Sequence, residues 1–223
     1  MHAHDLARET DLFNAECRFC VRPEPWRIVA TTENFLVMMG LGPPVEGYAL
    51  IITRYHVPCI AEIPSPQVEE FRDTLTRLRT AQLNTYGATL FFEHGRSGSC
   101  VRPGEGEDLC YHAHLHVLPA SIALADRVRN DYQLKTLGKW PDFFNEYATT
   151  RLPYILVQDR AGIAWFPVEQ RLPRHYLRSR VSELVGDPSR ADWVACPSYP
   201  VVAAGKSRLE PELRRQFQVA YTG

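Results

Sequence analysis

The chain has 223 residues, of which 45% are hydrophobic and 23% are charged, and its formal net charge at pH 7 is −1. This composition suffices for a packed core and lacks the basic excess with which proteins hold duplex nucleic acid. No apolar run approaches the ~18 residues of a membrane span, and the polar, acidic segment 1–12 does not read as a secretory signal. We therefore expect a cytoplasmic protein with neither a membrane nor duplex nucleic acid as partner.

Three short apolar, β-rich stretches at residues 35–39, 48–52 and 89–92 predict strands. Pro43, Pro44 and Gly47 lie between the first two and predict a hairpin connection. A helix is predicted between the second and third stretches, with Ser65 as its N-cap and Gly87 just past its end, because the apolar residues between them recur at helical spacing.

A glycine- and serine-rich loop at 95–108 precedes a fourth predicted strand at 110–118. This order of strands and helix predicts an α+β fold, an antiparallel sheet with a packed helix. Beyond it we predict a polar helix at 121–137, a hairpin of strands 154–157 and 163–166, and a last helix at 175–185. We assign residues 1–120 to a catalytic domain and 121–223 to a C-terminal extension on the same core.

The fourth strand carries three histidines at alternate positions, His112, His114 and His116. Side chains alternate along a strand, so these three line one face while the apolar residues between them face the core. A polar sheet face with incidental histidines explains the pattern poorly, because adjacent imidazoles repel when protonated. An all-histidine zinc site is also strained, because alternate residues lie ~6–7 Å apart. The pattern therefore favours chemistry on this face.

Cys17 and Cys20 are separated by two residues, a spacing with which two thiolates bind one tetrahedral zinc. The alternatives are buried free thiols and a thioredoxin-like redox pair. No βαβ pattern follows the pair, which disfavours redox chemistry.

The run from His112 to His116, followed by Val117 and Leu118, resembles the signature of the histidine-triad family. The context is similar too, since the run lies on the last strand after a glycine-rich loop, and residues 35–57 resemble the family's paired strands ending in a basic-aromatic-His turn. The resemblance implies that His114 attacks an α-phosphorus to form a covalent imidazole intermediate and that His116 binds phosphoryl oxygens or the leaving group. In zinc-containing branches, His56 and His112 would complete a structural zinc site with the two cysteines.

Further site candidates lie at the end of the third strand and in the loop after it. His94 is a candidate catalytic residue, expected to face the cleft mouth together with Glu93. The candidates for substrate binding are Glu93, Gly95, Ser97, Ser99 and Asp108.

The sequence departs from the family pattern around the substrate. Gly40 stands where nucleotide-hydrolysing members place an acidic residue for the ribose, Glu93 replaces a usual Asn, and Asp108 and Leu109 replace a usual Gln/Ser pair. The resemblance therefore implies that the nucleophile position is retained while the residues expected around the substrate differ from the family pattern.

The expected function is that of a homodimeric hydrolase or nucleotidyl transferase acting on a phosphoanhydride or phosphoramidate, most simply of a nucleotide. One alternative is a phosphoryl transferase or lyase for a non-nucleotide or nucleotide-sugar substrate in specialised biosynthesis. The other is a module that binds a nucleotide without turnover.

Overall fold

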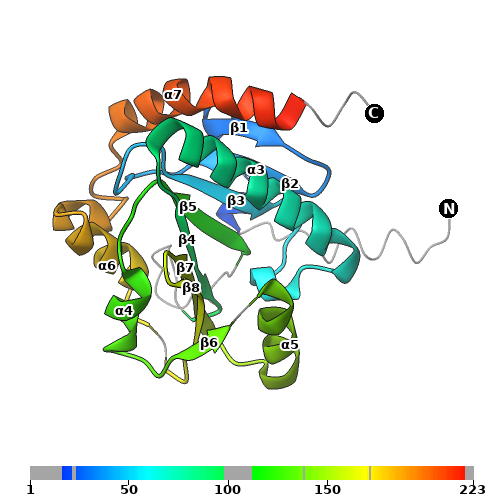
Figure 1. Cartoon of the computed structure of the whole chain (residues 1–223). Helices are drawn as coiled ribbons and strands as arrows, with labels where there is room; N and C mark the ends of the chain where they lie inside the picture. The colour runs from blue at the N-terminus through cyan, green and yellow to red at the C-terminus, as the bar shows by residue number, and fades with distance from the viewer. Residues whose placement is uncertain (1–16, 22–23, 98–111, 138, 171, 219–223) are drawn as a thin grey trace, which may run out of the picture.

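A computed structural model of the chain describes residues 17–21, 24–97, 112–137, 139–170 and 172–218. Within them, eight strands form one antiparallel sheet in the order β1-β2-β3-β5-β4-β7-β8-β6 (Figure 1). The strands are β1 (Ile28–Thr31), β2 (Phe35–Met39), β3 (Ala49–Thr53), β4 (Leu90–Gly95), β5 (His114–Leu118), β6 (Lys135–Leu137), β7 (Tyr154–Asp159) and β8 (Gly162–Pro167). The predicted α+β class and the four predicted N-terminal strands are confirmed, with shifted ends.

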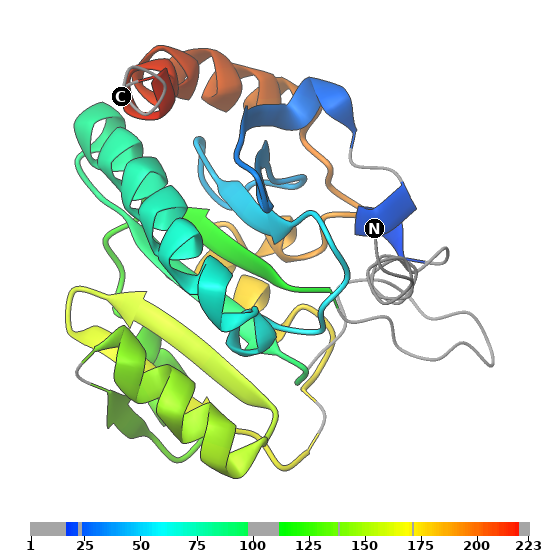
Figure 2. The same ribbon diagram turned by 90° about the vertical axis from the view of Figure 1, so that its right-hand side faces the viewer.

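Helices cover both faces of this sheet. The helices α3 (Val68–Tyr86) and α7 (Tyr199–Gln218) run side by side over one face, and α5 (Trp140–Thr150) packs on the same face beside β7 and β8 (Figures 1 and 2). The helices α4 (Leu124–Arg129) and α6 (Tyr176–Leu184) pack on the other face. The short elements are α2 (Arg18–Val21) and the 3-10 turns η1 (Pro25–Arg27), η2 (Ile60–Glu62), η3 (Ser65–Gln67) and η4 (Pro188–Ala191).

The predicted central helix is confirmed as α3, although its start differs from the prediction. Ser65 begins the 3-10 turn η3 and does not cap α3, because the backbone already turns helically before Val68 and Gln67 makes no side-chain cap. At the other end, Gly87 adopts the left-handed conformation (φ 77°) and its N–H donates to the Leu83 carbonyl. Glycine takes this conformation without steric cost, so the helix ends where predicted.

Beyond residue 120 the predictions hold in part. The hairpin is confirmed as β7 and β8, and β7 pairs with β4, so both strands extend the sheet that holds β5. The polar helix predicted at 121–137 is wrong in extent, because only α4 is helical and residues 135–137 form the edge strand β6. The helix α6 matches a prediction but is not the last, since α7 follows it, and α5 was not predicted.

No helix in the described parts of the chain is both long and apolar enough to cross a membrane.

Candidate active site and metal centre

The strand β5 divides its side chains between the two faces of the sheet. Ala113, Leu115 and Val117 are buried against α3 and its neighbours. His114 and His116 point to the face that α4 and α6 cover. Pairing with β3 on one side and β4 on the other holds this strand in the middle of the sheet, so its histidines have a fixed register.

His114 is half-buried, and its ring orientation is fixed by its own strand. Its Nδ1 lies 2.7 Å from the carbonyl oxygen of His112. A carbonyl only accepts, so Nδ1–H is the donor and the lone pair of the neutral ring is on Nε2. Burial lowers the pKa of His114 below its usual value, against the opposing effect of this hydrogen bond. The ring is therefore neutral at pH 7, as a nucleophilic imidazole must be.

His116 is buried between aromatic rings and contacts a tyrosine hydroxyl. Its ring stacks on Phe92, with centroids 4.5 Å apart. The Tyr48 hydroxyl lies 2.5 Å from Nδ1 and accepts a hydrogen bond from Arg178 at 3.1 Å. Arginine only donates, so Arg178 uses the Tyr48 oxygen as an acceptor and leaves the Tyr48 proton available to Nδ1 of His116. The other ring nitrogen, Nε2, is buried and has no hydrogen-bond partner among the described residues.

His94 lies on the same face, and its ring centroid is 6.1 Å from that of His116. The Leu177 backbone N–H donates to Nε2 of His94 at 3.1 Å, so Nδ1 carries the hydrogen. Nδ1 is also buried without a partner among the described residues. Burial lowers the pKa of His94 to about 3 and that of His116 well below its usual value. The ring of His116 lies 4.8 Å from that of His114, so the three histidines form one cluster in which neutral rings with N–H groups can donate to anionic oxygen atoms.

The four residues predicted to bind zinc lie together at the end of this site. One ligand atom from each of Cys17, Cys20, His56 and His112 lies within 4.8 Å of the others. The Sγ–Nδ1 distances are 3.4 Å for Cys17–His112, 3.4 Å for Cys20–His56 and 3.6 Å for Cys20–His112. Zn–S and Zn–N bonds at a tetrahedral angle would separate S from N by roughly 3.6 Å.

The second contact of His112 supports the same interpretation. Its Nε2 lies 2.8 Å from the Thr53 carbonyl oxygen, so Nε2–H donates and Nδ1 presents a lone pair toward the two thiols. Metal-bound histidines commonly donate their other ring N–H in this way. The donor set and its geometry therefore fit a tetrahedral zinc ion.

Glu93, Gly95 and Ser97, which were also predicted for the site, do not contact the rings of His114 or His116. Successive strand residues face opposite sides, so Glu93 points away from His94 and its buried carboxylate accepts from Ile60 N–H (2.8 Å) and the Tyr154 hydroxyl (2.5 Å). A Cβ on Gly95 would lie 2.0 Å from the Tyr154 ring, and the Ser97 hydroxyl donates to the Tyr154 carbonyl at 2.8 Å. All three residues pack or hydrogen-bond at the junction of β4 with β7. Ser99 and Asp108 lie outside the described residues.

The sequence-based predictions missed two residues of the site, Tyr48 and Arg178. Tyr48 could have been found, because it precedes Leu50 and Ile52 at strand spacing and the three share the face of His116. Gly40 belongs with it, since a Cβ there would lie 2.0 Å from the Tyr48 ring. Arg178 gives no such signal, because its position depends on how α6 packs across the sheet.

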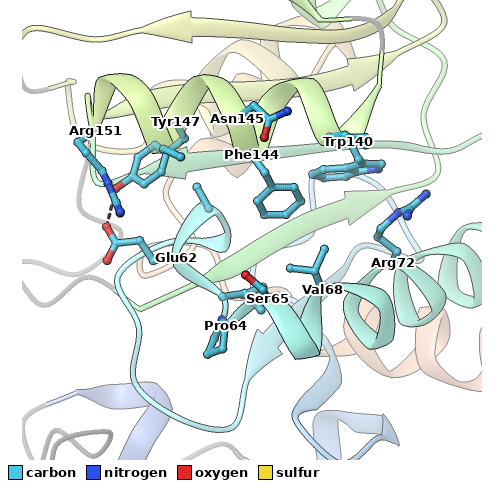
Figure 3. A pocket seen from close by; sticks show the side chains of 14 residues that line it. Glu62, Pro64, Ser65, Val68, Arg72, Trp140, Phe144, Asn145, Tyr147 and Arg151 are labelled. Atoms are coloured by element: carbon cyan, nitrogen blue, oxygen red, sulfur yellow. Dashed lines mark hydrogen bonds between the residues drawn. The ribbon is translucent and has the colours of Figure 1, made fainter.

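A separate cavity of about 640 Å³ lies on the opposite face, between α5 and the start of α3 (Figure 3). Trp140 and Phe144 form an aromatic wall, and Arg72 and Arg151 stand at its rim (Figure 3). None of the predicted site residues lines it.

No family model and no curated protein sequence matches this chain. The solved structures that resemble it include several named as histidine-triad proteins. A hypothetical histidine triad nucleotide-binding protein from Sulfolobus tokodaii is 13% identical, with 89% of this chain and 93% of that chain covered and a TM-score of 0.43. A Zn-bound histidine triad family protein from Mycobacterium smegmatis is 15% identical, with 80% and 95% covered and a TM-score of 0.34. A HIT-like protein from Bartonella henselae is 14% identical, with 42% and 65% covered and a TM-score of 0.32, so the chain spans just under two thirds of that relative's length.

Proposed function

We propose that this chain is a histidine-triad enzyme that transfers a nucleotidyl or phosphoryl group through a covalent intermediate on His114. The substrate is a phosphoanhydride or phosphoramidate, most simply of a nucleotide. The observation that carries the proposal is a neutral His114 ring with its lone pair on Nε2, clustered with the neutral rings of His94 and His116.

The chemistry follows from these positions. Nε2 of His114 attacks phosphorus as the bond from phosphorus to the leaving group breaks, and the leaving group departs with the bonding pair and takes a proton from solvent water. The ring becomes cationic, and the hydrogen bond from its Nδ1–H to the His112 carbonyl stabilises that charge. The N–H groups of His94 and His116 bind the phosphoryl oxygens. Water or another acceptor then attacks phosphorus, loses a proton, and returns the electron pair to Nε2.

We further propose that Cys17, Cys20, His56 and His112 hold a structural zinc ion. Four protein ligands leave no open position for water, so this ion would brace the start of β5 without taking part in the reaction.

A second candidate is supported by a specific observation. The Tyr48 ring fills the space beside Gly40, the position at which relatives that hydrolyse nucleotides carry a ribose-binding acid. Transfer from a non-nucleotide phosphate or a nucleotide-sugar is therefore the alternative.

The test is a turnover screen of wild-type protein beside His114→Ala. The panel contains dinucleoside polyphosphates, nucleoside phosphoramidates, nucleotide-sugars and plain nucleotides. Samples quenched early are analysed by intact-protein mass spectrometry. We expect turnover and a mass adduct in the wild type, both lost in a variant whose circular dichroism is unchanged. Turnover that survives in His114→Ala would refute covalent catalysis by this residue, and the substrate that reacts separates the two candidates.

A further inference from the structure

The first turn of α6 contacts both of the histidines that flank His114. The backbone N–H of Leu177 donates to Nε2 of His94 at 3.1 Å. The next residue, Arg178, donates to the Tyr48 hydroxyl at 3.1 Å, and that hydroxyl lies 2.5 Å from Nδ1 of His116. Two consecutive residues of one helix therefore reach two histidines on two strands.

The chemistry of the donors constrains these hydrogen bonds. A backbone N–H and a guanidinium can only donate, so His94 accepts at Nε2, and Arg178 uses the Tyr48 oxygen as an acceptor, which leaves the Tyr48 proton available to Nδ1 of His116. A neutral imidazole that accepts at one nitrogen carries its hydrogen on the other. With Tyr48 as the donor to Nδ1, His116 carries its hydrogen on Nε2, as His94 carries its own on Nδ1, and neither of these two nitrogens has a partner among the residues the structure describes.

The Arg178 side chain is well suited to impose this direction. It is 2% exposed, and its guanidinium also donates to the carbonyls of Gly42, Arg190 (3.0 Å) and Ala191 (3.1 Å). Its guanidinium carbon lies 5.4 Å from the centre of the Tyr48 ring. With its donors engaged on three sides, the guanidinium cannot turn away from Tyr48 without leaving buried carbonyls unpaired.

We propose that α6 is a positioning element of the triad, in which Leu177 N–H and the Arg178–Tyr48 pair hold His94 and His116 as single tautomers that present N–H donors. The use of those donors in phosphoryl transfer rests on the proposed function, but the tautomers themselves do not. This gives α6 a role beyond covering the sheet and explains why tyrosine, a donor and an acceptor at once, stands at position 48.

The tautomers can be read directly by nitrogen NMR of the full chain labelled with ¹⁵N-histidine at pH 7.5. His94→Gln and His116→Gln assign the two rings by loss of their signals. In the wild type we expect His116 to be the Nε2–H tautomer and His94 the Nδ1–H tautomer. A wild-type His116 that carries its hydrogen on Nδ1, or that averages between both nitrogens, overturns the proposal even if no variant folds.

Tyr48→Phe tests the relay itself. Without the hydroxyl we expect the His116 signals to move to the average of two tautomers, while those of His94 stay unchanged. Tyr176→Phe is the matched control, because it removes a hydroxyl on α6 that donates to Asp131 at 2.5 Å and not to His116. An unchanged His116 spectrum in folded Tyr48→Phe overturns the role of Tyr48. Expected tautomers in a protein without turnover would uphold this inference and reject the proposed function.

Discussion

At the scale of single residues, the Tyr48 ring occupies the space that a side chain at position 40 would need. The ring leaves no room for a Cβ at position 40, since the two would be 2.0 Å apart. An acidic side chain at position 40 is therefore incompatible with Tyr48 in its observed place. Gly40 and the Tyr48 hydroxyl beside His116 therefore occur together as a pair.

Gly40→Ala should destabilise the fold by about 1–3 kcal/mol, because the added methyl group forces a buried ring to move. In a Tyr48→Ala background the same substitution should cost close to nothing, since no ring remains to collide with it. Urea unfolding of the four proteins in this cycle measures the coupling. Equal costs in both backgrounds would contradict the shared volume.

The Glu93 carboxylate makes stability depend on pH. Burial raises its pKa from the usual 4.5 to about 8, despite hydrogen bonds from Tyr154 and Ile60. The folded state then holds a proton that the unfolded state has released, so this group's contribution to stability falls as pH rises from about 4.5 to about 8. Each pKa unit corresponds to ~1.4 kcal/mol, so the effect is on the order of a few kcal/mol.

Glu93→Gln should remove that dependence while keeping the shape of the side chain. We expect the variant to gain stability relative to wild type on going from pH 5.5 to pH 8, as measured by urea unfolding at both values. Glu69→Gln is the control, because its side chain is 83% exposed on α3. A constant difference between variant and wild type across this range would argue against a buried, proton-holding Glu93.

At the scale of elements, the sequence predicts what local pattern determines and misses what packing determines. The helix α3 was predictable because apolar spacing and Gly87 both act within the segment. The helix α7 was missed because Gly205 and Pro211 interrupt its pattern. Gly205 has a tertiary reason, since a Cβ there would lie 2.7 Å from the Gly47 nitrogen. The presence of glycine at position 205 is therefore explained by a contact between distant parts of the chain and not by the local sequence.

Leu209→Ala tests whether α7 belongs to the core. Leu209 is fully buried in the cluster that includes Phe71 and Leu75 of α3. The expected loss is 2–5 kcal/mol by the usual cost of emptying such a site. Leu83→Ala on α3 is the matched control, since that side chain is 46% exposed. Comparable small losses for both variants in chemical denaturation would show that α7 packs more loosely than the structure has it.

At the scale of the whole molecule, residues far apart in the chain converge on one face of one sheet. Alternation on β5 was enough to place His114 and His116 on one face, because strand period is a local property. The same rule should have separated Glu93 from His94, which sequence reasoning instead placed together. The contacts of α6 with the site depend on the packing of residues beyond 120 over the triad face, which no motif encodes.

The cysteine–histidine cluster ties three distant segments together, so a bound zinc ion should stabilise the fold as a whole. Cys17 and Cys20 come from the N-terminal segment, His56 follows β3, and His112 precedes β5. A metal that binds these ligands only when folding brings them together contributes its binding free energy to stability.

We therefore expect about one equivalent of zinc in purified protein. On chelation we expect Tm to fall by roughly 5–10 °C, since a chain of this size loses roughly 2–4 °C of Tm for each kcal/mol of unfolding free energy that is lost. Metal analysis and thermal melts with and without chelator measure both. Cys20→Ser should begin with the lowered Tm and respond little to chelator, whereas Cys196→Ser, a cysteine outside the cluster, should respond as wild type does. Zinc well below one equivalent in folded protein, or a chelator effect that persists in Cys20→Ser, would mean that these four residues are not the metal site. Because His112 also supplies the carbonyl that orients His114, loss of the metal should disturb the His114 ring together with the fold.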